Sequence, residues 1–330
     1  MNKRFSASPD IARWGLLGMK RTLLGILLLL APAFAKTPGP APRFDAWKII
    51  GPGGGGTMIA PTISPHDPNL VVEHCDMTGA YITHDGGLSW RMFNLRAVVN
   101  TFAFDPKNAN VIYAGNAALW RSEDQGRSWS MVLPDPRKDT VEHQVGDHSG
   151  YVLTSADPAY PKKQGEITAI AVDPASSKRI DVAFSEGRGV SVLLESNDEG
   201  RSWKQRATFS RPVLKLVFSR SGLLAVSGEA VYRVTKDASN SLPALGSGIR
   251  AVSAAHNGDA TWFYATTRAG GVSVSEDGGQ SWRRATPQLG QESGRFEAIA
   301  ASEEHAMTAY AGFRNLQLGA GRENRFNGIA

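Results

Sequence analysis

Cysteine is almost absent from this chain of 330 residues, in which Cys75 is the single example. One thiol excludes an internal disulfide framework. A convincing long helical period is missing as well, which argues against a mainly helical fold. We interpret Cys75 as a small buried residue of a strand rather than as a reactive thiol.

Excess positive charge is also missing once the amino-terminal segment is set aside. The formal net charge is +5, but residues 1–35 contain five Lys or Arg residues and one Asp, so the remainder carries only +1. No basic patch of the kind that binds nucleic acid is then left. We therefore expect no nucleic-acid partner.

The segment Lys20–Ala35 reads KRTLLGILLLLAPAFA. Two basic residues, an apolar run and small residues at the end are typical of a secretory signal peptide, here residues 1–35, with cleavage before Lys36. The run is short for a membrane span, so we expect no span after signal removal and a secreted or periplasmic protein. Met19 is a candidate for the true start, and the alternative is a longer, genuine leader.

One eight-residue pattern, Ser/Thr-x-Asp-x-Gly-x-Ser-Trp, occurs four times, with its Asp residues 39, 74 and 79 positions apart. Recurrence of a fixed pattern indicates a repeat architecture. Each copy suits a hairpin turn, in which the Asp accepts N–H groups one and two residues on and the Gly adopts a positive φ. The Trp would begin the next strand and cover the turn. We assign structural roles to Asp85, Trp90, Asp124, Trp129, Asp198, Trp203, Asp277 and Trp282.

These strings resemble the Asp-box (BNR) motif of β-propellers. Aligned on the boxes, the units begin with a short apolar strand and often an Asp-Pro turn, as at Asp67-Pro68, and end near Trp90, Trp129, Trp203, Asn240 and Trp282. We predict an all-β β-propeller over residues 36–330, with four-stranded blades and a core shared between them. About six blades are expected, the alternative being an incomplete seven-bladed propeller cut off in its last blade, because no box follows Ile329-Ala330.

The register of such blades assigns loops to faces. Boxes and Asp-Pro turns belong to one face, whereas loops between second and third strands and links between blades belong to the other, where propellers usually bind ligands. The insertion from Pro134 to Glu166 falls on that second face and carries Glu142, His143, Asp147, His148 and Tyr151. Candidate substrate-binding residues there are Tyr81, Asn116, Arg188, Arg268 and Arg314.

The segment from Gly53 to Tyr81 resembles the amino-terminal signature of glycoside hydrolase family 74, which has a glycine run, two strands and the string Asp-x-Gly-Gly-x-Tyr-Arg. That family comprises inverting endo-acting xyloglucanases and related β-glucanases built from two seven-bladed propellers. The resemblance implies a polysaccharide partner and makes Asp76 the candidate catalytic base. Thr78 replaces the first Gly of the pair, and Ile82 replaces the Arg.

Inversion requires a second carboxyl group, about 6.5–9.5 Å from the first. The family's partner carboxylate belongs to its second propeller, which this chain lacks. Glu186 and Asp147 are the partner candidates within the sequence. The spacing alone does not determine either distance.

Two other functions remain open. A non-catalytic propeller would bind glycan or protein, as sortilin-like domains and photosystem assembly factors do. A sialidase would need an arginine cluster, and the early Arg-Ile-Pro string of sialidases is missing around Arg43. His143, Asp147 and His148 match no defined metal-site spacing, so we expect neither a metal nor a cofactor.

Overall fold

The chain divides into two units, Met1–Ile49 and Ile50–Ala330, and every residue that the structure describes belongs to the second. The structure is a computed structural model. It describes residues 51–329 except 53–55, 78, 146–149, 187–188, 221, 236–238, 244, 246–247, 286–291, 303–304 and 319–324. The predicted signal segment 1–35 and its cleavage point lie outside the described residues.

Every regular element among the described residues is a β-strand. Five four-stranded antiparallel sheets form there, each with its strands in chain order. The first two comprise β1 (Met58–Ile63), β2 (Val71–Cys75), β3 (Ala80–Thr83), β4 (Arg91–Phe93), β5 (Thr101–Phe104), β6 (Ile112–Gly115), β7 (Leu119–Ser122) and β8 (Ser130–Leu133). The next three comprise β11 (Glu166–Asp173), β12 (Ser176–Ser185), β13 (Ser191–Ser196), β14 (Lys204–Phe209), β15 (Val213–Ser219), β16 (Gly222–Ser227), β17 (Val231–Val234), β18 (Ser239–Ser241), β19 (Ile249–Asn257), β20 (Ala260–Thr267), β21 (Val272–Ser275) and β22 (Arg283–Arg284).

Two smaller sheets complete the described chain. A hairpin of β9 (Thr140–Val145) and β10 (Gly150–Ser155) lies in the link between β8 and β11. A three-stranded sheet consists of β23 (Glu292–Ala301), β24 (Ala309–Leu318) and β25 (Arg325–Ile329). The sequence predicted an insertion between β8 and β11. It did not predict that two strands of this insertion pair, because a single hairpin has no repeat to align with.

The core lies between neighbouring sheets. One cluster joins side chains of the sheets β1–β4, β5–β8 and β11–β14, and further clusters join each later sheet to the next. A strand packed on both faces is buried along its length, as the second strands show: all four residues of β6 are buried, and so is the polar Asp181 of β12. The predicted sharing of the core between blades is confirmed.

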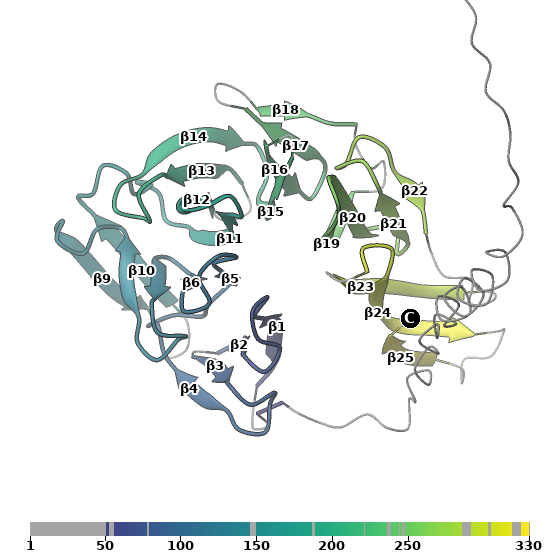
Figure 1. Ribbon diagram of the computed structural model, residues 1–330, viewed down its shortest axis with the longest axis horizontal. Helices are drawn as coiled ribbons and strands as arrows, with labels where there is room; N and C mark the ends of the chain where they lie inside the picture. The colour runs from purple at the N-terminus through teal and green to yellow at the C-terminus, as the bar shows by residue number, and fades with distance from the viewer. Residues whose placement is uncertain are drawn as a thin grey trace, which may run out of the picture. The chain divides into compact units, whose positions relative to one another are not determined.

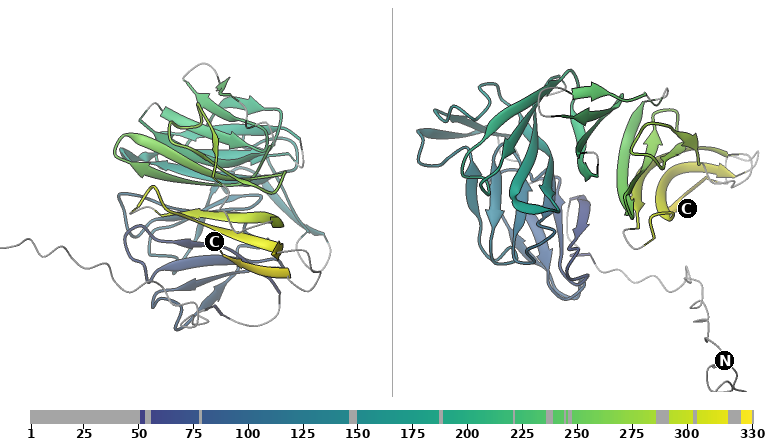
Figure 2. Two further views of the ribbon diagram at one scale, coloured as in Figure 1. Left: turned by 90° about the vertical axis from the view of Figure 1, so that its right-hand side faces the viewer. Right: turned by 45° about the horizontal axis from the view of Figure 1, so that its top comes forward.

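The sheets are arranged as a β-propeller. The first strand of each sheet contacts the first strand of the next, in the order β1, β5, β11, β15, β19 and β23. Figure 1 shows these sheets following one another in chain order from β1 to β25, and Figure 2 shows their strands from the side. The five four-stranded sheets are five blades, so the predicted all-β propeller with four-stranded blades is confirmed, and the predicted number of about six blades stays a prediction. Four of them end one strand beyond the Trp that the sequence suggested as the end of the unit, whereas the suggested end of the fourth, Asn240, lies within its last strand, β18.

The repeated eight-residue pattern forms the turn between third and fourth strands in four of these blades. In the second blade the Ser122 hydroxyl accepts the N–H of Gly126 at 2.7 Å and donates to Asp124 at 2.8 Å. Asp124 in turn accepts the N–H and the hydroxyl of Ser128, at 2.8 and 2.7 Å. The other three copies repeat this pattern, at Asp85, Asp198 and Asp277.

One expected detail of this turn was wrong. The Asp accepts from the residue four positions on, and the Ser or Thr hydroxyl, rather than the Asp, accepts the N–H groups inside the turn. Hydrogen bonds from Ser128 lower the pKa of Asp124 to about 2. The Gly has the expected positive φ, for example +79° at Gly126, where a Cβ would lie 2.5 Å from Cδ1 of Ile82 and 3.6 Å from the Trp129 ring.

Candidate functional site

The two ends of each blade carry different loops. Backbone hydrogen bonds join the turn after the first strand to the repeated turn, as from Gly86 to the carbonyl of Asn69 and from Gln125 to that of Asn110. These turns therefore share one face of the propeller. Because neighbouring strands are antiparallel, the loops between second and third strands lie at the opposite end. Asp76, Asn116, Glu186 and Arg268 all follow a second strand and belong to that opposite face, as predicted.

Asp76 follows the end of β2 and is exposed. Its Oδ1 accepts the backbone N–H of Thr57 at 2.8 Å and the thiol of Cys75 at 3.4 Å, while its own N–H donates to the Thr57 carbonyl at 3.1 Å. The hydrogen bond from Thr57, with a smaller one from Cys75, lowers the pKa of Asp76. Asp76 is therefore an oriented carboxylate that stays ionised in contact with solvent.

Gly56 makes this orientation sterically feasible. Its φ is +89°, and a Cβ at this position would lie 2.8 Å from Oδ1 of Asp76 and 3.0 Å from Sγ of Cys75. Only glycine allows the backbone to come so close at this φ without strain. Cys75 is buried, as expected, and its thiol helps to hold the carboxylate.

Tyr81 lies within β3, where it pairs with Glu73 and Met92, and its side chain is half-buried. Its neighbour Glu73 is buried, and burial raises the pKa of that carboxyl group. Tyr81 therefore belongs to the wall of the first sheet rather than to the turn that carries Asp76.

Asn116 has a different role from the substrate contact that the sequence predicted. It is 0% exposed, and its amide donates to the carbonyl of Leu95 at 3.0 Å. Its Oδ1 accepts the N–H of Ala118 at 2.9 Å and the indole N–H of Trp120 at 3.2 Å. The side chain is used inside the fold, so we correct this position to a structural one.

The remaining candidates are distributed as follows. Glu186 forms an ion pair with Lys163 at 3.2 Å. Arg268 is exposed, and its side chain lies close to Gly228, in the loop between β16 and β17, and to Gly248, in the link before β19. Asp147, His148 and Arg188 lie outside the described residues, and of Arg314 only the backbone, in β24, is described.

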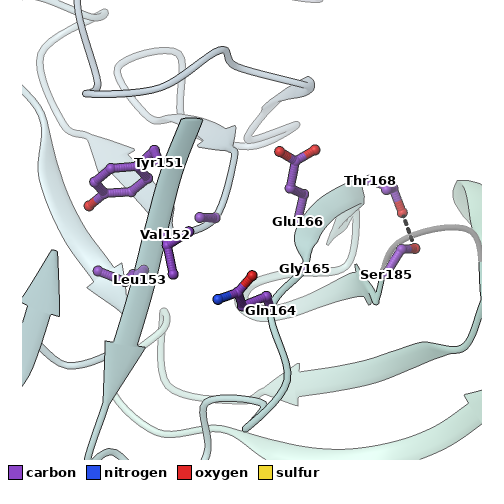
Figure 3. Close-up of a pocket in the computed structure, with 9 residues that line it drawn as sticks. Tyr151, Val152, Leu153, Gln164, Gly165, Glu166, Thr168 and Ser185 are labelled. Atoms are coloured by element: carbon purple, nitrogen blue, oxygen red, sulfur yellow. Dashed lines mark hydrogen bonds between the residues drawn. The ribbon is translucent and has the colours of Figure 1, made fainter. Parts of the chain in front are cut away.

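The described residues of this face also form a pocket of about 360 Å³ that the sequence did not predict. It lies between the inserted hairpin and the third blade, and Figure 3 shows β10 on one side and β11 on the other. Its volume falls within the usual range for ligand sites, about 300–1,000 Å³. The residues that line it are Ala117, Tyr151, Val152, Leu153, Gln164, Gly165, Glu166, Thr168 and Ser185.

Glu166 is the carboxylate of this pocket. Its Oε2 accepts a hydrogen bond from the Asn100 amide at 2.9 Å, and its side chain projects into the space between β10 and β11 in Figure 3. Thr168 donates to the carbonyl of Val213 at 2.7 Å and lies 2.9 Å from the Ser185 hydroxyl. The only sequence signal for this site was the end of the long insertion at Glu166.

Charged side chains stabilise the hairpin that forms the opposite wall of the pocket. Tyr151 is half-buried on β10, and burial, with a smaller contribution from the negative charge of Glu142, raises its pKa to about 12. Glu142 forms an ion pair with Arg96, whose guanidinium lies 5.8 Å from the ring centre of Trp120. These contacts connect the hairpin to the second blade, which stabilises this wall.

A second cavity, of about 480 Å³, lies between the sheets β19–β22 and β23–β25. Its lining is mostly apolar, with Val272, Ile299 and Ala311 among its residues. It is part of the packing between two sheets and holds few polar groups that would orient a ligand.

Neither a metal site nor a membrane helix is found in the described part of the chain. No group of three or more His, Cys, Asp and Glu side chains is arranged there to hold a metal ion. Likewise, none of the described segments is a helix long and apolar enough to cross a membrane.

Known structures with this topology include enzymes. An ancestral enzyme of glycoside hydrolase family 74 superposes with a TM-score of 0.57 at 20% identity, over 82% of this chain and 38% of that one. The family 74 xyloglucanase of Xanthomonas campestris gives 0.53 at 20% identity, over 77% of this chain and 43% of the enzyme. The chain thus spans less than half the length of either.

A propeller from another class of protein is similar too. The β-propeller domain of Cps50 (Swd1) from Myceliophteria thermophila gives a TM-score of 0.50 at 15% identity, over 78% of this chain and 80% of that domain. No protein-family model matches the sequence, and no curated protein matches it significantly. At such low identities the likeness shows the fold alone, so the chain is a β-propeller similar in fold to family 74 glycoside hydrolases.

Proposed function

We propose that this protein acts on an extracellular polysaccharide of the xyloglucan or β-glucan type, with Asp76 as the general base. The observation that carries the proposal is the state of Asp76, which is exposed, ionised and oriented by Thr57 on the face opposite the repeated turns. The resemblance of Gly53–Tyr81 to the family 74 signature and the likeness of the fold to family 74 enzymes support it.

The chemistry assigned to Asp76 is activation of water. A base must be ionised and lie within about 2.6–3.2 Å of the water that it deprotonates. Oδ2 can accept that proton, because in the described part of the chain the Thr57 N–H and the Cys75 thiol both engage Oδ1. Glu186 and Asp147 remain the proposed acid partners.

Replacing Asp76 by Asn tests this proposal because it retains the shape and removes the charge. Release of reducing ends from xyloglucan and mixed-linkage β-glucan should fall on the order of 100-fold or more at unchanged Tm. Asp259→Asn is the matched control, an exposed Asp that pairs with Arg220 on the other face. An active Asp76→Asn variant would exclude Asp76 as the base.

The second candidate is a non-catalytic propeller that binds glycan or protein. Two observations favour it: Glu186 is engaged by Lys163, and the similar Swd1 propeller shows the same fold outside this enzyme family. If the wild-type protein binds the polysaccharide without cleaving it, and Asp76→Asn weakens binding, this candidate replaces the hydrolase.

We include three further features in the proposal. First, we assign the four repeated turns as Asp boxes, and the hydrogen bonds between their hydroxyl groups and carboxylates support this assignment. The sheet β23–β25 is a sixth blade of a six- or seven-bladed propeller. Residues 1–35 direct export, so mature protein recovered outside the cytoplasm should begin near Lys36, which amino-terminal sequencing measures.

A further inference from the structure

We propose that the pocket between β10 and β11 binds one neutral sugar residue of a glycan, with Glu166 as the principal hydrogen-bond acceptor. The proposal rests on the function proposed above but concerns a different site, because Asp76 lies in the first blade and this pocket lies beside the third. Both belong to the face of the loops between second and third strands, where a chain-like ligand can reach both.

The charge of Glu166 is not compensated within the described structure. Glu186 has Lys163 and Glu142 has Arg96, whereas among the described residues no cation pairs with Glu166. The Asn100 amide occupies one position on Oε2 and orients the group. No other hydrogen bond from a described residue reaches this carboxylate, so Oε1 and the second lone pair of Oε2 remain for a ligand, which suits two neighbouring hydroxyl groups.

The hydroxyl groups of the pocket also accept rather than donate. Thr168 uses its proton on the carbonyl of Val213. Ser185 and Ser191 share a hydrogen bond of 2.5 Å, and Ser191 accepts the N–H of Val213 at 3.0 Å. The protons of this network are therefore largely used inside the protein, so a ligand has to supply donors to these hydroxyl groups, while the Gln164 amide can donate to a sugar oxygen.

The facing wall is apolar. Val152 of β10 faces the pocket, whereas Tyr151 and Leu153 project from the other side of that strand in Figure 3. Ala117 lies in the loop between β6 and β7. A wall of this kind packs against the C–H face of a sugar ring, while the carboxylate edge takes its hydroxyl groups. A polyhydroxylated ring matches both edges, whereas a purely apolar ligand would leave Glu166 desolvated and unpaired.

The test measures binding of xyloglucan-derived and mixed-linkage β-glucan oligosaccharides to the full chain by calorimetry. Glu166→Ala should weaken binding by roughly 10-fold or more, as expected for loss of a charged acceptor. Glu166→Gln, which keeps the shape and one acceptor, should lose less. Glu123→Ala is the matched control, an exposed Glu in a repeated turn of the opposite face, and should bind like the wild type. The Tm of each variant checks folding.

Salt dependence separates a neutral sugar from a cationic ligand. Binding of a neutral ring should change little between about 0.02 and 0.5 M salt, whereas a cation would be screened. A steep loss with salt would overturn the sugar assignment. If Asp76→Asn weakens binding and Glu166→Ala does not, the pocket is not a subsite although the proposed function stands. If the wild type binds neither glycan, the proposed function fails, and this inference fails with it.

Discussion

Asp181 on β12 lies directly opposite Glu195 on β13, and both carboxyl groups are buried. Arg179 lies 3.1 Å from Asp181 and 3.4 Å from Glu195, while Arg206 lies 2.5 Å from Glu195. Burial raises the pKa of Asp181 to about 7 against the attraction of Arg179. Burial also opposes ionisation of Glu195, but the hydrogen bonds from Arg206 and Asn197 outweigh it, so its pKa lies below the ordinary value. Asp181 therefore keeps its proton to a higher pH than Glu195 does.

This pair predicts that stability depends on pH. In the unfolded chain Asp181 titrates near 3.8, whereas in the folded protein it titrates near 7. Between these values the native state keeps a proton that the unfolded state has lost, so the free energy of unfolding falls as pH rises from about 4 to 7. Asp181→Asn should flatten this fall in urea unfolding experiments across that range. The control Asp259→Asn should keep the wild-type slope, and an unchanged slope in Asp181→Asn would contradict the assignment.

The repeated turn predicts a ranking of two substitutions. Ser122 is buried and accepts the N–H of Gly126, whereas Asp124 is partly exposed and its donors can turn to water. Ser122→Ala should therefore lower the free energy of unfolding by about 1–3 kcal/mol. Asp124→Ala should cost less. Chemical unfolding measures the free energy of unfolding of both variants. A larger loss in Asp124→Ala than in Ser122→Ala would show that the carboxylate contributes more to the turn than the hydroxyl group does.

Gly56 predicts a variant that disturbs Asp76 without changing it. Gly56→Ala places a Cβ 2.8 Å from the Asp76 carboxylate at a φ of +89°. Activity or glycan affinity should fall toward that of Asp76→Asn, together with some loss of stability. Gly222→Ala is the matched control, since its φ is +110° but its nearest neighbouring atom is 3.8 Å away. It should lose stability while the folded fraction keeps its affinity.

The buried hydrogen bonds of Asn116 predict that its substitution lowers stability but leaves the glycan affinity of the folded protein unchanged. Asn116→Ala leaves the Leu95 carbonyl, the Ala118 N–H and the Trp120 indole N–H without their buried partner. The free energy of unfolding should fall by about 2–4 kcal/mol. Intrinsic tryptophan fluorescence and urea unfolding measure it. A stable variant with weakened glycan binding would restore the ligand role that the sequence suggested.

The fold and its turns could be predicted because their information is local and repeated. The Ser–Asp–Gly–Ser network of each turn spans at most seven residues, such as Ser122 to Ser128, and recurs in four blades. A pattern that repeats at fixed positions also fixes the order of strands around it. The hairpin β9–β10 escaped prediction because it occurs once, inside an insertion that interrupts the repeat.

The sequence by itself determined the β-propeller, the position of the repeated turns and the loop that carries Asp76. Only the tertiary structure decided which loop residues face solvent and which lie inside. The Asn116 amide points inward, where it bonds to Trp120 and Leu95. Glu166 lines the pocket and accepts a hydrogen bond from Asn100, which is 66 positions away. The physical reason is that contacts between blades depend on how whole sheets pack against each other, and residue spacing along one blade does not specify them.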